Sequence, residues 1–298
     1  MTGVVKPSPW WRRVNWMRLV VAAYALLLLA SVWSFAAQGD LTLGRRPLAN
    51  LQRTLAELSH PSFLDLWWGS PRLEYRADDG RLLRVEDRRA VEARYLQGVL
   101  RATWTTLKIG TLGAFLAALA ALPLGFAAAR NVRAAGWIAR PARAVLDVTR
   151  AIHTLVWGLL YVGIVGLGPV AGILAIASHS LGSYGKLYAE AIEAADAGQM
   201  ESGLALGLRP WQVLLFALRR SFYPQFVSTH LYLWEFNVRD STVLGLIGAG
   251  GLGLLVSEAV SLFQWGRLAT LLIVIVALVV ALDRGSAWLR RRLQAGVR

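Results

Sequence analysis

Residues 188–225, YAEAIEAADAGQMESGLALGLRPWQVLLFALRRSFYPQ, form the polar stretch around which the rest of the chain is organised. We expect its first part to be helical, because Glu190, Glu193 and Asp196 recur every three residues among good helix formers. Gly198 interrupts them. Long apolar runs flank the stretch on both sides, so the pattern predicts a loop that a membrane protein exposes to water.

A second short helix is predicted from about residue 200 to residue 206 of this loop. Gly207 should end that helix, because glycine readily adopts the left-handed conformation that terminates helices, and Pro210 suits the start of the next segment. Two short helices joined through a glycine on an exposed loop favour a part that another protein grips.

The composition indicates an integral membrane protein. Of the 298 residues, 56% are hydrophobic and thirteen are tryptophan. A soluble domain of this length would not carry several apolar runs of about 20 residues. The net charge of +14 comes from basic residues clustered at the ends of apolar runs. That placement is typical of cytoplasmic membrane flanks, so we expect a membrane partner and no nucleic acid.

The predicted fold is all-α, with six transmembrane helices and both termini in the cytoplasm. The expected spans are about 17–37, 103–129, 144–167, 170–187, 222–238 and 268–282. This topology satisfies the positive-inside rule in every short loop. The first span is too long for the apolar part of a signal peptide, so we expect it to be retained.

Four segments are expected along the chain. They are the N-terminus with the first span at 1–37, an extracytoplasmic loop at 38–96, a core of five spans at 97–283 that contains the loop 188–220, and a basic cytoplasmic tail at 284–298. Within the extracytoplasmic loop, Asp79-Gly80 lies between two alternating segments, which is the pattern of a small β-hairpin.

Metal and catalytic chemistry find no support in the residue pattern. The chain has no cysteine, and its four histidines lack metal-ligand spacing. No G-x-x-x-x-G-K-[ST] phosphate loop is present, so this chain should not hydrolyse ATP. We therefore expect no catalytic residue, no metal and no cofactor in this chain.

Residues 248–253, GAGGLG, match the G-x-G-x-x-G pattern of dinucleotide-binding folds. The acidic residue that such a fold needs about 20 positions later would fall inside an apolar span, so we reject a dinucleotide site. Two alternatives remain: close helix packing through small residues, and irregular backbone at membrane depth that lines a cavity or a gate. We favour the gate.

The loop at 188–225 resembles the cytoplasmic coupling loop of permease subunits in ABC importers. That family's pattern is Glu-Ala-Ala, three residues, Gly, nine residues and then Ile-x-Leu-Pro. Glu201 and Gly207 have the matching separation. The departures from the two alanines, the isoleucine and the Leu-Pro are Ser202, Gly203, Ala217, Arg219 and Arg220.

A second resemblance is more specific. Residues 234–253, WEFNVRDSTVLGLIGAGGLG, look like the segment that follows the coupling loop in phosphonate-importer permeases. Residues 150–169 and 179–193, and the second span with TLKIGTLGAFLAALAALPLGFAAARN, are similar to that family in order and spacing. The resemblance covers about 97–282, and the loop 38–96 is longer than we expect for the family.

This resemblance implies a type I ABC importer permease fold with a cytoplasmic coupling-helix loop. The implied function is to form the translocation path for phosphonates or related phosphorus oxyanions such as phosphite, phosphate or phosphate esters. The implied partners are two ABC ATPase subunits that bind ATP and Mg and dock on residues 190–210, a periplasmic or lipid-anchored substrate-binding protein, and a second permease, identical or different. The implied location is the bacterial inner membrane.

Two sets of residues would carry that function. The ATPase-coupling set is Glu193, Glu201, Ser202, Gly203, Ala205, Leu206, Gly207, Leu208 and Arg209. The gate and translocation set is Asn237, Arg239, Ser241, Thr242, Gly245, Gly248, Gly250, Gly251 and Gly253. An anion on a dry path needs compensating donors, because a charge at the bilayer centre costs about 2.5–3.5 kcal/mol. Arg239 would supply positive charge unless it pairs with Asp240 or Glu235.

Other polar residues in the spans have competing interpretations. Lys108 attracts the anion or anchors its helix at the interface. Asp147 and Arg150 lie three residues apart on one helix face, so we expect them to pair. His153 and His179 either satisfy helix contacts or relay protons.

Three other functions stay open. The same fold could import another small solute such as methionine or betaine. A membrane-embedded enzyme would need acidic and histidine residues at i, i+3 or i+4 on facing helices, and the six expected spans lack such a pair. A scaffold or sensor subunit without transport is compatible with the missing Leu-Pro.

Overall fold

A computed structural model of the chain describes residues 10–39, 46–68, 72–76, 81–130, 136–194, 205, 207 and 223–295. By its internal contacts the chain divides into two units, residues 1–55 and residues 56–298. Apart from one β-hairpin, the regular secondary structure of the described residues is helical. The predicted all-α class is therefore confirmed for this part of the chain.

The first unit holds helix α1 (Trp10–Gln38). Its stretch from Trp16 to Gln38 is long and apolar enough to cross a membrane, and none of it is buried within the chain. A helix that is apolar on all sides and exposed on all sides suits a lipid environment. The predicted first span is confirmed as a helix of suitable length and composition. Helix α2 (Pro47–Leu58) follows it in the sequence.

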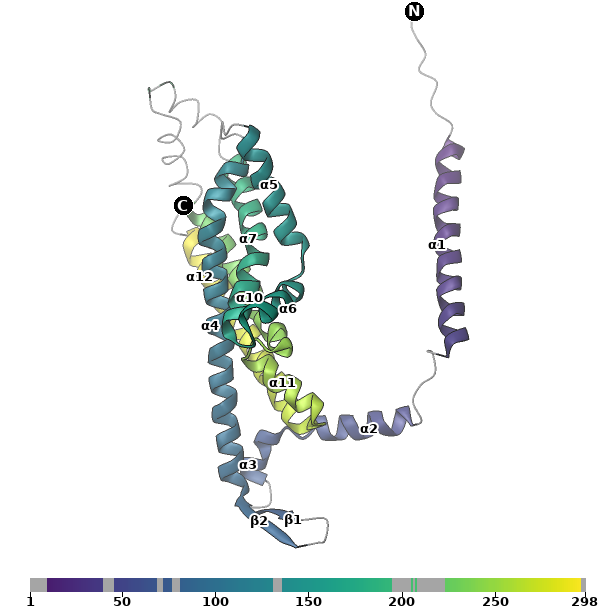
Figure 1. Ribbon diagram of the computed structural model, residues 1–298, viewed down its shortest axis with the longest axis vertical. Helices are drawn as coiled ribbons and strands as arrows, with labels where there is room; N and C mark the ends of the chain where they lie inside the picture. The colour runs from purple at the N-terminus through teal and green to yellow at the C-terminus, as the bar shows by residue number, and fades with distance from the viewer. Residues whose placement is uncertain are drawn as a thin grey trace, which may run out of the picture. The chain divides into compact units, whose positions relative to one another are not determined.

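The second unit begins with short elements that include the predicted hairpin. They are a 3₁₀ helix, η1 (Ser62–Leu64), a single helical turn, α3 (Asp65–Trp68), and two strands, β1 (Arg72–Arg76) and β2 (Leu82–Asp87). The strands pair antiparallel with Arg72 opposite Asp87. Figure 1 shows the hairpin next to the start of the long helix α4, and we call this end of the unit the hairpin end.

Helix α4 (Arg88–Ala128) has 41 residues and is therefore about 60 Å long, twice the thickness of a bilayer core. Asp87 caps its start, because the side chain accepts a hydrogen bond from the backbone N–H of Arg89 at 3.0 Å. Charged residues occupy its first turns up to Arg101, and the apolar part begins at Thr103, as predicted. Pro123 lies inside the helix.

Small residues allow α4 to run close along helix α7 (Pro169–Glu193), as Figure 1 shows. A Cβ atom added to Gly113 would lie 2.7 Å from Ile176 Cβ, and one added to Gly125 would lie 3.0 Å from the carbonyl oxygen of Gly185. Buried alanines continue the same face of α4 between these glycines. Backbones that approach this closely gain dispersion contacts, which stabilise helix pairs in a membrane.

The span predicted over 144–167 is broken and is not a single helix. The chain forms α5 (Gly136–Ala151) and α6 (Thr154–Val165), which meet at an angle of 91°. His153 starts the new helix, since its Nδ1 accepts a hydrogen bond from the backbone N–H of Leu155 at 3.2 Å. Helix α5 is amphipathic and carries several arginines, so its polar face could not lie in hydrocarbon. Helix α6 alone is only about 18 Å long.

The predicted turn between α6 and α7 is confirmed. Helix α6 ends at Val165 and α7 begins with Pro169 at its first position. Gly166 and Gly168 between them have positive φ angles of 89° and 142°. The Gly-x-Gly-Pro sequence therefore reverses the chain direction after α6 and starts the next helix, α7.

The remaining helices are α10 (Tyr223–Leu244), the 3₁₀ turn η3 (Gly245–Ile247), α11 (Leu252–Ser261) and α12 (Trp265–Ala295). Helices α10 and α11 meet at 42°. By length and composition, three described helices can cross a membrane, or five spans result if each bent pair counts as one. Helix α7 is not among them, and the six-span topology stays a prediction.

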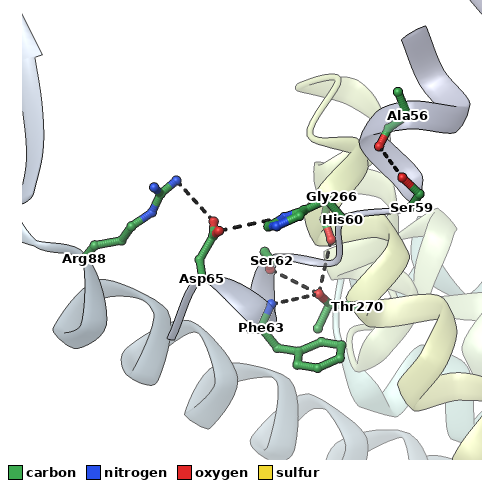
Figure 2. Close-up of polar contacts among 9 residues, drawn as sticks. All are labelled: Ala56, Ser59, His60, Ser62, Phe63, Asp65, Arg88, Gly266 and Thr270. Carbon is green, nitrogen blue, oxygen red and sulfur yellow. Dashed lines mark hydrogen bonds and ion pairs between the residues drawn. The ribbon is translucent and has the colours of Figure 1, made fainter. Parts of the chain in front are cut away.

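Hydrogen bonds fasten the segment before α4 to α12 at the hairpin end (Figure 2). Thr270 lies 3.1 Å from the hydroxyl of Ser62 and accepts a hydrogen bond from the backbone N–H of Phe63 at 3.4 Å. Asp65 lies between Arg88, at 3.1 Å, and His60, at 3.8 Å. Part of the predicted extracytoplasmic loop is thus integrated into the helical unit.

Candidate translocation path and coupling end

A row of buried polar side chains lies between α4, α7 and α10. Ser241 shares its hydroxyl hydrogen between the backbone carbonyl of Thr106 at 3.0 Å and that of Val238 at 2.7 Å. Ser180 donates to Asn237 Oδ1 at 2.6 Å. All five of these residues are almost completely buried. Buried polar groups need such partners, because an unpaired one costs about 1–3 kcal/mol. Asn237 and Ser241, both predicted path residues, are therefore interior residues of this conformation.

Asn237 has one further property. Its amide nitrogen is buried, and no hydrogen-bond partner lies within reach of it among the described residues. Only 1% of the residue is exposed. An amide N–H group that lacks an acceptor can donate to an oxyanion or to another acceptor that approaches it.

The glycine-rich segment breaks the helix as predicted. After η3, the residues Gly248, Gly250 and Gly251 have positive φ angles of 96°, 85° and 73°, and α11 then begins at Leu252. L-residues with a side chain rarely adopt these angles. The irregular backbone that we favoured at this place is confirmed, while its role as a gate stays a prediction.

Close packing occurs at the same glycines, so the two alternatives coexist. A Cβ atom added to Gly253 would lie 2.7 Å from Gly245 Cα and even closer to the carbonyl oxygen of Thr242. One added to Gly245 would lie 2.5 Å from the carbonyl oxygen of Gly250. Both are backbone contacts, which leave no room for a side chain at either glycine.

Thr106 of α4 fixes both sides of the break. Its hydroxyl accepts a hydrogen bond from the backbone N–H of Leu252 at 2.9 Å, while its carbonyl accepts from Ser241. A side chain on Gly251 would collide with the same hydroxyl. Sequence analysis missed Thr106, because a single threonine in an apolar span gives no sign of its partner.

Arg239 pairs with Glu235, which was one of the two pairings that we considered. The distance from Arg239 Nη2 to Glu235 Oε1 is 3.2 Å, and 49% of the arginine side chain is exposed against 13% of the glutamate. Asp240 instead accepts a hydrogen bond from Thr154 at 2.8 Å. Thr242 donates to the carbonyl oxygen of Arg239 at 2.6 Å, so its hydroxyl stabilises α10 itself.

The predicted coupling residues lie mostly outside the described residues. This applies to Glu201, Ser202, Gly203, Leu206, Leu208 and Arg209. Ala205 is helical and exposed, and Gly207 has a φ angle of 78°, the left-handed conformation expected of a glycine that ends a helix.

Glu193 is the one described coupling residue before that gap. Its carboxylate accepts a hydrogen bond from the backbone N–H of Arg130 at 2.8 Å and so joins the end of α7 to the end of α4. A pocket of about 300 Å³ opens here. Its lining includes Arg130, Arg143, Asp147, Arg150, Lys186, Glu190 and Glu193. We call this end of the unit the coupling end.

The other polar residues considered in the sequence, Asp147, Arg150, His153 and His179, make contacts within the fold. Asp147 and Arg150 pair at 3.0 Å, which confirms their expected interaction. His179 Nδ1 lies 2.8 Å from the carbonyl oxygen of Ile152, and His153 caps α6. Among the described residues, no group of three His, Asp or Glu side chains has a geometry that could hold a metal ion.

Comparison with known proteins identifies the family to which the chain is similar. Residues 121–295 match the family described as "Binding-protein-dependent transport system inner membrane component". The chain is 38% identical over 195 residues to the putative phosphite transport system permease protein HtxC of Stutzerimonas stutzeri. The aligned region covers 65% of this chain and 69% of that protein. The chain is also 38% identical over 186 residues to the phosphite transport system permease protein PtxC of the same organism, 62% and 68% of the two chains.

A phosphate-import permease and a solved transporter are also similar. PhnE of Mycolicibacterium smegmatis is 38% identical over 188 residues, which cover 63% of this chain and 35% of that protein. A chain of the MetNI methionine ABC transporter, solved in inward-facing conformations, superposes with a TM-score of 0.60. It is 21% identical and covers 67% of this chain and 98% of the solved chain, so the likeness concerns the fold alone.

Proposed function

The chain belongs to the family of binding-protein-dependent transport system inner membrane components, and from this premise we propose that it forms the translocation path of an ATP-driven importer for phosphorus oxyanions. As a member of this family it is a multi-pass inner-membrane permease and not an enzyme. The observation that carries the choice of substrate is the 38% identity to permeases named for phosphite and phosphate transport.

The proposed path runs along α10 and the glycine break. Asn237, Ser241 and Thr242 are buried here, and Arg239 lies on the exposed side of the same helix. In alternating access, the angle between α10 and α11 would change at the glycines Gly245, Gly248, Gly250, Gly251 and Gly253. The absence of room for side chains and the positive φ angles support a break that the sequence is built to maintain.

The proposed coupling runs through residues 190–210 to two copies of an ABC ATPase subunit, which would bind ATP and Mg. Gly207 in the left-handed conformation suits a helix that ends on this loop. Glu193 links the loop to α4, so a push on the loop would reach two helices at once. A substrate-binding protein and a second permease, identical or different, would complete the importer.

The proposed topology has six spans with both termini in the cytoplasm. Helix α7 is 25 residues long, about 37 Å, which is enough to cross the bilayer core. Two of its buried polar residues, Ser180 and Tyr184, contact Asn237 and His230 of α10. In this arrangement the third crossing consists of the bent pair α5 and α6, with amphipathic α5 at the coupling end.

Uptake measurements test the proposed function. A strain that lacks the gene should lose uptake of phosphite, a phosphonate or phosphate, and plasmid-borne wild-type gene should restore it. Methionine and betaine serve as comparison solutes in the same strains. Restored uptake of one of those two solutes, with no effect on any phosphorus oxyanion, would overturn the proposed substrate class.

Purification tests the partners separately. The chain isolated from native membranes in mild detergent should carry an ATPase subunit with a phosphate loop, identified by mass spectrometry. The presence or absence of a second permease sequence decides between a homodimer and a heterodimer. Isolation without any ATPase, under conditions that preserve known importers, would contradict the coupling role and favour a scaffold.

A further inference from the structure

An intramembrane ion pair on α10 suggests how the path handles an anion, and the inference rests on the proposed function. Four exposed residues of the helix recur at i, i+4, i+7 and i+11 and therefore form one face. They are Tyr232, Phe236, Arg239 and Val243. Arg239 is thus a cation among three aromatic or aliphatic neighbours on this face.

Contacts with α4 fix the depth of this pair. Val238 packs on Gly110, where an added Cβ would lie 2.6 Å from Val238 Cα, and Trp234 donates to the hydroxyl of Thr111 at 2.9 Å. Glu235, next to Trp234, is therefore about level with Thr111. Thr111 lies eight residues inside the apolar part of α4 that begins at Thr103, which corresponds to about 12 Å.

The direction of the arginine side chain also places the ion pair deep in the membrane. Side chains on a helix point toward its N-terminus, and α10 runs antiparallel to α4, so the guanidinium of Arg239 points deeper into the membrane toward Glu235. A basic anchor that snorkels would point the other way, toward the nearer surface. The pair therefore lies near the bilayer middle, where a lipid-facing charge costs about 2.5–3.5 kcal/mol. This cost argues that the face borders a polar route.

We propose that Glu235 is the resident counter-ion of an oxyanion site at Arg239, and that a passing phosphorus oxyanion displaces it. Half of the arginine side chain is exposed, so its guanidinium can accept an anion, whereas Glu235 is mostly covered. A guanidinium matches the tetrahedral oxygens of phosphite, phosphonate or phosphate. Lys108 is exposed on α4 at nearly the same level and adds positive charge, and it has no ion-pair partner in the part of the chain that the structure describes.

The counter-ion has two consequences for transport. In the empty path, Glu235 compensates a charge that would otherwise be stranded at low dielectric. In the loaded path, it competes with the substrate, so the anion is held weakly enough to leave. Transport needs binding that permits both arrival and departure.

Binding to the purified permease–ATPase complex in nanodiscs tests the proposal. Phosphite and inorganic phosphate are titrated at constant ionic strength, and the rise in melting temperature gives the half-saturating concentration. Glu235→Gln should lower that concentration about 2- to 10-fold, the range between a solvent-exposed helix pair and a charge-assisted hydrogen bond. Arg239→Gln should raise it at least about tenfold.

Three further variants make the result specific. Asp147→Asn removes the acid of another intrahelical ion pair, at the coupling end, and should leave the half-saturating concentration unchanged. Glu235→Gln combined with Arg239→Gln should behave like Arg239→Gln alone, because Glu235 acts through Arg239. Glu235→Asp, whose shorter side chain should hold Arg239 less well, should give an intermediate shift and serves if Glu235→Gln folds poorly.

Two results would overturn the counter-ion role. One is an unchanged half-saturating concentration in Glu235→Gln. The other is that Glu235→Gln lowers this concentration equally in the wild-type and in the Arg239→Gln background. Uptake of phosphite or phosphate by the wild-type complex is measured in parallel. If uptake occurs while the variants bind alike, only the inference fails. If the wild-type transporter carries no phosphorus oxyanion, the proposed function fails, independently of the anion titration.

Discussion

The replacement Gly253→Ala tests the close approach of α10 and α11 at the glycine break. The added methyl group would lie 2.7 Å from Gly245 Cα and 2.9 Å from the backbone nitrogen of Leu246, and it would collide with the carbonyl of Thr242. None of these backbone atoms can rotate away as a side chain can, so the two helices must separate. Overpacking of this kind costs about 1–3 kcal/mol.

The melting temperature of the purified complex in detergent measures the effect. At about 2–4 °C per kcal/mol for chains of 150–250 residues, we expect Gly253→Ala to melt about 2–12 °C lower than wild type. Gly285→Ala is the matched control. It also lies within a helix, nothing lies within 4 Å of its added Cβ, and alanine should stabilise that helix by about 0.5–1 kcal/mol.

The two readouts separate packing from gating. Equal melting temperatures for Gly253→Ala and Gly285→Ala would refute the close approach. A lowered melting temperature with normal uptake per folded molecule would leave packing as the sole role of the glycine. A lowered melting temperature with lost uptake is the result that a gate at this break requires.

Three more substitutions test individual contacts. Ser180→Ala should lower the melting temperature by removing the donor to Asn237 Oδ1, at a cost of about 1–3 kcal/mol; a wild-type melting curve would contradict that hydrogen bond. Thr106→Val keeps the shape of the side chain but leaves the N–H of Leu252 unpaired, so it should destabilise the complex by a similar amount. Thr106→Ser keeps the hydroxyl and should not lower the melting temperature; equal melting curves for the two variants would contradict the bond. Gly207→Val should abolish uptake while the protein stays in the membrane fraction, because a β-branched residue is strained at a φ angle of 78°; normal uptake would remove the coupling role.

Local sequence patterns predicted much of the fold. Apolar length indicated the helices, the Gly-x-Gly-Pro turn ended α6 and started α7, and Asp79-Gly80 marked a hairpin whose strands the structure contains. The pair Asp147–Arg150 followed from helical spacing alone. Each of these features depends on residues within a few positions of one another, which is why the sequence suffices.

The break at His153 could not be predicted in the same way. The charged residues Asp147 and Arg150 precede the break but also fit the end of a longer helix, and a histidine that caps a helix looks in sequence like a histidine inside one. The buried partners Thr106 and Ser180 are likewise far in sequence from Ser241, Leu252 and Asn237, and only the packing of α4 and α7 on α10 brings them together. A single sequence carries no record of such pairings.

Thr106 links the glycine break to the rest of the unit in a way that constrains any gate. Through its carbonyl it holds Ser241, three residues before α10 ends, and through its hydroxyl it holds Leu252, where α11 begins. A change in the 42° angle between these helices must therefore break or reorient one of the two bonds. Ser241 also donates to the carbonyl oxygen of Val238 within α10 at 2.7 Å, so it keeps a hydrogen bond if the one to Thr106 is lost. In the proposed gate, the packing of Val238 on Gly110 and the hydrogen bond from Trp234 to Thr111 would hold α10 on α4, so a movement of α11 would leave the ion pair on α10 at its depth.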